Sequence, residues 1–207
     1  MDDKLKELIG KISETFIKYG IKSVTMDDLA RNLHVSKKTL YQYFDDKQDL
    51  VKTCLKHHID VDMCEIKANS ENRVNAIDEM YSMGKAVSHR ASQIHPSIFY
   101  DLEKYYPEAW DLFNDYRKGQ IYETIKDNIE RGMAEGLYRS DLNVDVIAGI
   151  YVLRIDDLTN QEIFPSDKYP FGDLYLEVMR YHIRGMASDK GIEYLKQLVE
   201  QERNNQS

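Results

Sequence analysis

The stretch VSKKTLYQYF, from Val35 to Phe44, gathers side chains that could bind a nucleic acid. At a helical period of about 100° per residue, Leu40 and Phe44 share one apolar face with Val35. The opposite face carries only donors, cations and aromatics: Lys38, Thr39, Tyr41, Gln42 and Tyr43. Such a face predicts a surface that contacts a polyanion.

Each of these groups suits one part of a DNA duplex. A glutamine such as Gln42 can pair with adenine through two hydrogen bonds, and a lysine can reach guanine or a phosphate. Tyrosine hydroxyls can hold phosphates. In an isolated ten-residue segment, solvated lysines and packing tyrosines explain the same pattern. The flanking residues are therefore needed to distinguish a DNA-binding face from an ordinary solvated surface.

A second group, Cys54, His57, His58 and Cys64, could suggest a metal site or a redox-active thiol. On one helix, residues 54 and 64 lie about 15 Å apart, too far for a disulfide or for one tetrahedral ion. No basic neighbour lowers the pKa of either thiol. We expect no metal and no cofactor. We also expect no enzymatic activity, because the sequence lacks the common phosphate-loop, hydrolase and zinc-protease motifs.

The elements that position these residues are predicted to be helices. Apolar residues recur at helical spacing along the chain, alternating patterns are scarce, and all four prolines fall at plausible breaks. The predicted helices are about 3–19, a short one after Thr25, 37–44, one after Asp46, 71–93, 97–105, 107–135, 141–161, 170–187 and 189–203. Thr25, Ser36 and Asp46 are predicted caps. The fold class is therefore all-α.

The segment from Thr25 to Leu55 has the build of a helix-turn-helix, in which a second short helix enters the major groove of DNA. It closely resembles the DNA-binding domain of the TetR/AcrR family of transcriptional regulators. The resemblance rests on three motifs: T-x-x-x-L-A at 25–30, V-S-x-x-T-L-Y-x-Y-F at 35–44 and K-x-x-L at 47–50.

This resemblance implies a role for each matching residue. Phosphate contacts are expected from Thr25, Ser36, Tyr41, Tyr43 and Lys47, and base contacts from Lys37, Lys38, Thr39 and Gln42. Two positions depart from the family pattern. His34 stands where glycine is common, and it can adopt a left-handed conformation less readily than glycine. Lys38 stands where the family often has glycine or another small residue, so we expect either a longer reach to DNA or a different base preference.

The net charge of -8 does not exclude a DNA partner. Residues 1–50 contain 9 basic and 9 acidic side chains, whereas residues 51–207 contain 19 and 27, so the excess acid belongs to the second part. The N-terminus has no apolar block typical of a signal peptide, and no apolar run is long enough to span a membrane. The sequence predicts a cytoplasmic protein.

The resemblance implies two domains, a DNA-binding domain at 1–48 and a helical ligand-binding and dimerisation domain at 49–207. Family members dimerise through their last two long helices, here about 144–160 and 171–186. The candidate interface residues are Ile147, Ile150, Tyr151, Ile155, Leu174, Val178 and Tyr181. The alternative is that both apolar stripes belong to the core of one chain.

An aromatic cluster in the middle of the chain could line a pocket for a small hydrophobic effector. Its members are Tyr81, Met83, Phe99, Tyr100, Tyr105, Tyr106, Trp110, Phe113 and Tyr116. Any one of these residues could instead be ordinary core.

These observations predict a homodimeric DNA-binding regulator, a repressor that a small hydrophobic ligand releases from an inverted-repeat operator. The alternative is a DNA-tethered adaptor that binds a protein partner and needs no small ligand. A closed apolar cavity in the second domain would favour the regulator, and an exposed apolar patch would favour the adaptor.

Overall fold

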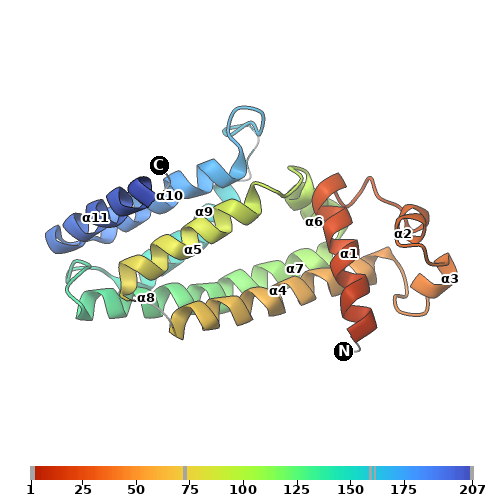
Figure 1. The fold of residues 1–207 in the computed structure, drawn as a ribbon, viewed down its shortest axis with the longest axis horizontal. Coiled ribbons are helices and arrows are strands. Elements are labelled where there is room, and N and C mark those ends of the chain that lie inside the picture. The colour runs from red at the N-terminus through yellow and green to blue at the C-terminus, as the bar shows by residue number, and fades with distance from the viewer. Residues whose placement is uncertain (1–2, 72–73, 159, 161, 206–207) are drawn as a thin grey trace. The chain divides into compact units, whose positions relative to one another are not determined.

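The computed structural model describes residues 3–71, 74–158, 160 and 162–205, and within these ranges it is helical with no strand. The elements are α1 (Asp3–Tyr19), α2 (Met26–Asn32), α3 (Lys37–Leu40), α4 (Lys47–Glu71), α5 (Ala76–Ala91), α6 (Ile98–Tyr105), α7 (Pro107–Tyr116), the π-helix η1 (Arg117–Ile121), α8 (Tyr122–Ala134), α9 (Val144–Leu158), α10 (Phe171–Met186) and α11 (Asp189–Asn205) (Figure 1). The predicted all-α fold is confirmed. None of the described helices is both long and apolar enough to cross a bilayer.

The chain packs as two compact units. The first unit comprises residues up to 65 together with 93–116, and the second comprises 66–92 together with the residues from 117 onward. The predicted boundary at residue 48 divides the chain by expected function, whereas the two units are defined by packing. The predicted boundary stays a prediction.

The first unit has its own apolar core. Its most deeply buried side chains come from four of its helices and the turn after α3: Ile9, Ile12, Phe16, Leu29, Leu40, Phe44 and Leu50. The first helix ends at Gly20, whose φ of 80° is a left-handed conformation that glycine adopts without strain. The amide of Gly20 donates to the carbonyl of Phe16 at 2.8 Å and closes the last turn.

Two boundaries differ from the sequence prediction. The predicted helix 37–44 is regular only over Lys37–Leu40, although backbone hydrogen bonds continue as a turn to Phe44. The predicted helix 107–135 is interrupted by the π-helix at 117–121, where the backbone widens to i→i+5 bonding. Gly119 lies within this interruption, but a single glycine inside a helical pattern does not by itself predict a π-helix.

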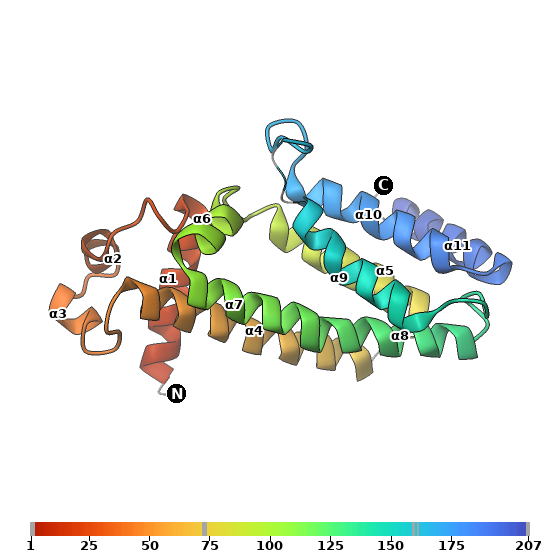
Figure 2. The ribbon, with the colours of Figure 1, turned by 180° about the vertical axis from the view of Figure 1, so that it is seen from behind.

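The second unit is a bundle in which α5 packs along α10 and α8 packs along α9 (Figure 2). Its core includes Ile77, Met80, Ile125, Ile129 and Met179. Close approach of α5 and α10 is possible at Gly84, where an added Cβ would lie 3.2 Å from the Met179 side chain.

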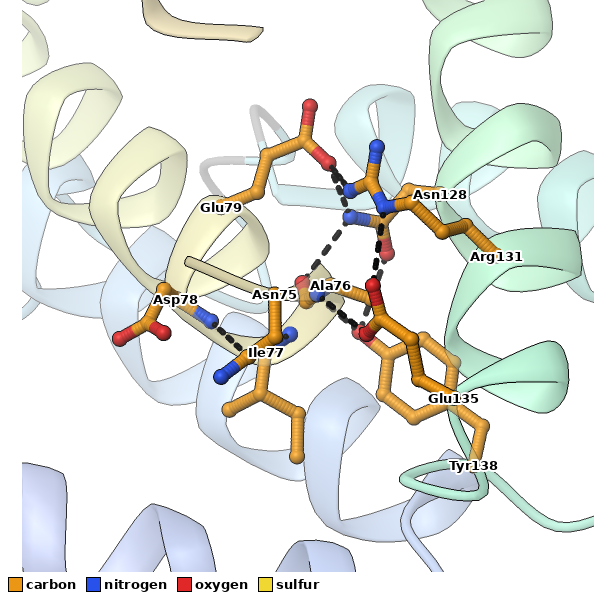
Figure 3. Close-up of polar contacts among 9 residues, drawn as sticks. All are labelled: Asn75, Ala76, Ile77, Asp78, Glu79, Asn128, Arg131, Glu135 and Tyr138. Atoms are coloured by element: carbon orange, nitrogen blue, oxygen red, sulfur yellow. Dashed lines mark hydrogen bonds and ion pairs between the residues drawn. The ribbon is translucent and has the colours of Figure 1, made fainter. Parts of the chain in front are cut away.

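A buried polar network joins the start of α5 to α8 and to the turn after it (Figure 3). Asn75 caps α5 by accepting from the amides of Ile77 and Asp78. The amide and carbonyl of Ala76 are both engaged: Glu135 accepts from the amide at 2.8 Å, and Asn128 and Tyr138 donate to the carbonyl at 3.0 and 3.2 Å.

The same network contains a partly buried ion pair. Glu79 accepts from Asn128 at 2.5 Å and pairs with Arg131. Burial raises the pKa of the Tyr138 hydroxyl, so this group remains a neutral donor. Because the buried polar atoms satisfy one another, the network can hold one arrangement of α5 against α8.

Candidate DNA-binding site

The α2–turn–α3 segment is held by caps at both helix starts. Thr25 and Asp28 form a capping box: the Thr25 hydroxyl accepts from the Asp28 amide, and the Asp28 carboxylate accepts from the Thr25 amide. The Ser36 hydroxyl accepts from the Thr39 amide at 3.0 Å. Both predicted caps are therefore observed, and Asp46 likewise accepts from the Asp49 amide at the start of α4.

The turn between α2 and α3 needs a left-handed residue, and His34 supplies it with φ 55°. This conformation lets the Val35 amide donate to the Ala30 carbonyl at 3.0 Å, which brings the two helices together. Ala30 and Leu40 are buried at this junction. His34 thus adopts the conformation for which glycine is more common at this position.

The buried positions fix which side chains face outward. Leu40 and Phe44 anchor the segment in the core of the first unit, with exposed fractions of 0% and 2%. Of the nine predicted DNA-binding residues, seven are exposed, Thr25, Ser36, Lys37, Lys38, Tyr41, Gln42 and Tyr43, and two are half-buried, Thr39 and Lys47. A continuous set of donors and aromatics therefore surrounds the buried anchor.

Some of these side chains already have partners within the chain. Lys37 donates to Asp27 at 2.9 Å, and this hydrogen bond raises the pKa of the Lys37 ammonium. The hydroxyls of Ser36 and Thr39 lie 2.7 Å apart. By contrast, Lys38, Tyr41 and Gln42 make no side-chain hydrogen bond to any described residue, so their polar groups are available to a ligand.

Lys47 points inward rather than into solvent. Its ammonium donates to the carbonyls of Ile21 at 2.7 Å and Lys22 at 3.4 Å, and burial lowers its pKa. The Lys47 ammonium also lies 5.6 Å from the centre of the Tyr106 ring. These hydrogen bonds of Lys47 link the loop after α1 to the start of α4. The predicted contact of Lys47 with a phosphate stays a prediction.

Comparison with known proteins places this geometry in a family. Residues 8–54, which contain the whole helix-turn-helix, match the family described as "Bacterial regulatory proteins, tetR family". This stretch of the chain belongs to the TetR family of transcriptional regulators. Its family and its relatives are regulators of transcription rather than enzymes.

Relatives extend the similarity beyond the DNA-binding segment of the regulator. The HTH-type transcriptional regulator YvaF of Bacillus subtilis (strain 168) is 22% identical over 183 residues, which cover 86% of this chain and 95% of YvaF. The HTH-type transcriptional repressor KstR2 of Mycolicibacterium smegmatis is 23% identical over 146 residues, which cover 68% of this chain and 70% of KstR2.

The fold of the regulator is similar to that of a transcriptional regulator from Saccharomonospora viridis, solved in complex with choline. The TM-score is 0.72 at 18% sequence identity, over 90% of this chain and 100% of that one.

The ion pair between Lys37 and Asp27 was not evident in the sequence, because the two residues lie ten positions apart on different helices. Asp27 places a negative charge beside the candidate DNA-binding face and occupies Lys37. We therefore expect Asp27→Asn to tighten binding to random duplex DNA by up to roughly fivefold at low salt.

Fluorescence anisotropy at two salt concentrations measures this effect, which should shrink as salt rises. Asp60→Asn, at an exposed site on α4, is the matched control for the change in total charge. Equal tightening in both variants would show that Asp27 acts only through net charge.

The predicted effector-binding residues are divided between the two units of the regulator. Tyr81 and Met83 belong to the second unit, and the others belong to the first. In the first unit, Phe113 lies 5.9 Å from Phe99 and 5.7 Å from Trp110, measured between ring centres. These three rings are half-buried and form one aromatic cluster on α6 and α7.

The remaining aromatics have other surroundings. Tyr100 is exposed and accepts a hydrogen bond from Lys104, and the Tyr105 hydroxyl accepts one from Lys22. Tyr106 is buried beside Lys47, and Tyr116 is buried as well. The effector role of the whole set stays a prediction.

The helices predicted to dimerise expose a stripe of apolar side chains on α9. Val146, Ile150 and Leu153 lie on one face at helical spacing, and Leu153 is 63% exposed. On α10, Tyr181 is 68% exposed, and Leu174 and Val178 are half-buried.

Two of these exposed residues, Val146 and Leu153, were absent from the sequence prediction. Of the predicted residues on α9, Ile150 is exposed, Ile147 is half-buried and Tyr151 belongs to the core. The Tyr151 hydroxyl lies 2.5 Å from that of Tyr175. The Ile155 side chain lies outside the described residues.

Proposed function

We propose that this regulator is a sequence-specific repressor, which a small hydrophobic ligand releases from an inverted-repeat operator. The observation that carries the proposal is the outward face of α3 and the turn after it. The side chains of Lys38, Tyr41 and Gln42 make no hydrogen bond to the described residues there, and buried residues anchor their backbone. Gln42 and Lys38 suit base edges, and Tyr41 suits a phosphate.

A single short helix reads only a few base pairs, so specific binding favours two copies on two half-sites. The exposed apolar stripe on α9 and Tyr181 on α10 would form the interface, because a two-fold interface uses the same surface on both subunits. The recognition helices of such a dimer would meet half-sites about 34–36 Å apart, or a multiple of this distance. A regulator of this kind acts on DNA in the cytoplasm.

The dimer proposal predicts that Leu153→Glu separates the subunits. An unpaired carboxylate buried at the centre of an interface costs about 3 kcal/mol or more, so the dimer should weaken by roughly 100-fold. Sedimentation equilibrium and operator binding measure the two consequences. Val74→Glu, at an exposed site before α5, should leave both unchanged. A fully dimeric Leu153→Glu protein would place the interface elsewhere.

Release by a ligand requires that α6 and the DNA-binding segment move together. In the first unit, Asp101 of α6 accepts from the Lys22 amide at 3.0 Å and from the Ser97 hydroxyl at 3.1 Å. Gln48 of α4 donates to the Tyr105 carbonyl at 2.8 Å. A ligand that shifts α6 would therefore also shift the loop after α1 and the start of α4.

The repressor name of KstR2 and the choline complex of the Saccharomonospora viridis protein support the choice of a ligand-released repressor over an adaptor. The effector would lower DNA affinity by the ratio of its own affinities for the two conformations.

Selection of bound sequences from random duplex DNA at about physiological salt tests the proposal. We expect enrichment of an inverted repeat, whose half-site spacing gives the distance between the recognition helices. Weak binding without an enriched motif would contradict sequence-specific regulation and would favour a DNA-tethered adaptor.

A further inference from the structure

A pocket of about 340 Å³ lies in the second unit, between α10 and α11 and against Tyr81 of α5. Its volume falls at the small end of the range for ligand sites, roughly 300–1,000 Å³. Tyr81, Ile183 and Leu195 provide an apolar floor, and each of them is at least 92% buried. An apolar group that enters the pocket would therefore be removed from water and would contact side chains that are themselves buried.

The rim of the pocket carries more positive than negative side chains. Three cations, Arg180, Arg184 and Lys196, face two acids, Glu177 and Glu200. This local balance contrasts with the acidic second part of the chain, which holds 19 basic and 27 acidic residues. The side chains that line the pocket thus include one more cation than acids, whereas acids outnumber cations in the second part of the chain.

The three rim cations differ in their partners. Arg180 lies 3.4 Å from Glu177, and Lys196 lies 3.7 Å from Glu193. The side chain of Arg184 makes no hydrogen bond or ion pair with any described residue. Its position in the last turn of α10 suits a cation, because the carbonyl end of a helix is negative. Helix electrostatics explains the charge of Arg184 but does not explain the apolar floor beside it.

We propose that this pocket binds a small amphiphilic anion, a molecule with one carboxylate and a short apolar body. The apolar body would rest on Tyr81, Ile183 and Leu195, and the carboxylate would pair with Arg184. A guanidinium can donate two parallel hydrogen bonds to a carboxylate, which fixes the orientation of the ligand. A cationic amphiphile would meet three like charges, and a neutral one would leave Arg184 unpaired at the mouth of the pocket.

Binding at this pocket does not depend on DNA or on the aromatic cluster at Phe99, Trp110 and Phe113, so it can be measured separately. The probes are decanoate, decanol and decyltrimethylammonium, each titrated into the full chain by calorimetry below its micelle concentration. We expect decanoate to bind at least tenfold more tightly than decanol and still more tightly than the cation. Its affinity should fall as salt rises.

Two variants place the binding at this pocket. Arg184→Gln removes the unpaired cation and should weaken decanoate about tenfold while leaving decanol unchanged. Val199→Trp fills the space between α10 and α11 and should weaken both probes. Lys168→Gln, in the exposed segment before α10, removes the same charge away from the pocket and should change neither affinity. Thermal unfolding of each variant verifies that it is folded.

Several outcomes would overturn the proposal. One is absence of decanoate binding to the unaltered chain. Another is equal affinity for the anionic and cationic probes, which would mean that the rim charges play no part. A third is decanoate binding that Arg184→Gln leaves unchanged, or that Lys168→Gln weakens equally, because the anion would then bind elsewhere or respond only to net charge. Because Arg184 is exposed, Arg184→Gln is expected to fold even if the larger Val199→Trp change does not.

Discussion

Gln42→Ala should remove the base preference at one position of each operator half-site and weaken binding there by about 1–3 kcal/mol per half-site. Gln42 is exposed and its side chain makes no hydrogen bond to a described residue, so its side-chain amide is free to pair with a base edge. Alanine keeps the turn after α3 but cannot donate or accept. Competition binding with operators altered at each position in turn measures the change.

The distinctive expectation is a loss of discrimination at one position rather than a uniform loss of affinity. The variant should bind all four bases there almost equally, and the dependence of its affinity on salt should not change, because no phosphate contact is lost. Gln120→Ala, at an exposed site in η1, is the matched control. If Gln42→Ala kept the full base preference at every position, α3 would meet DNA through another face.

The local features of this site could be predicted from sequence because each depends on neighbouring residues. The caps at Thr25 and Ser36 involve residues only three positions away. The left-handed conformation of His34 follows from the tight turn between two helices. The buried positions of Leu40 and Phe44 follow from helical periodicity.

The directions of the long cationic side chains could not be predicted, because tertiary contacts set them. Lys47 donates to a carbonyl 26 positions earlier, and Lys37 pairs with Asp27 across the turn. No pattern of residue types specifies such partners. Lysine is also flexible enough to choose between an internal acceptor and a phosphate.

The exposed face of α9 was only partly predictable for a different reason. This helix is apolar around most of its circumference, so its periodicity does not separate a face that packs in the core from one that packs on a partner. Of the two candidate interface residues Ile150 and Tyr151, the first is exposed and the second lies in the core, and Leu153, which was not among the candidates, is exposed. The packing of α9 against α8 and α10 settles which side remains exposed.

Gly132→Ala should destabilise the second unit by up to about 2 kcal/mol, although alanine is the better helix former. Gly132 lies in α8, where alanine alone would gain about 1 kcal/mol. An ideal Cβ at this position would lie 2.1 Å from Cδ2 of Tyr138, and overpacking of this kind typically costs 1–3 kcal/mol. Tyr138 cannot easily move away, because its hydroxyl donates to Asn128 at 3.0 Å and to Ala76 at 3.2 Å.

The midpoint of denaturant unfolding measures this loss, and two further variants identify its cause. Gly10→Ala, in α1, adds a Cβ with no atom within 4 Å and should stabilise the chain by up to about 1 kcal/mol. In a Tyr138→Ala background the ring is absent, so Gly132→Ala should cost little or become favourable. A cost that stayed the same without the ring would trace the effect to the α8 backbone. If the cost of Gly132→Ala disappeared without the ring, the cause would be the overlap between the added Cβ and the ring of Tyr138. Glycine at position 132 would then be the residue that leaves room for Tyr138 in the polar network.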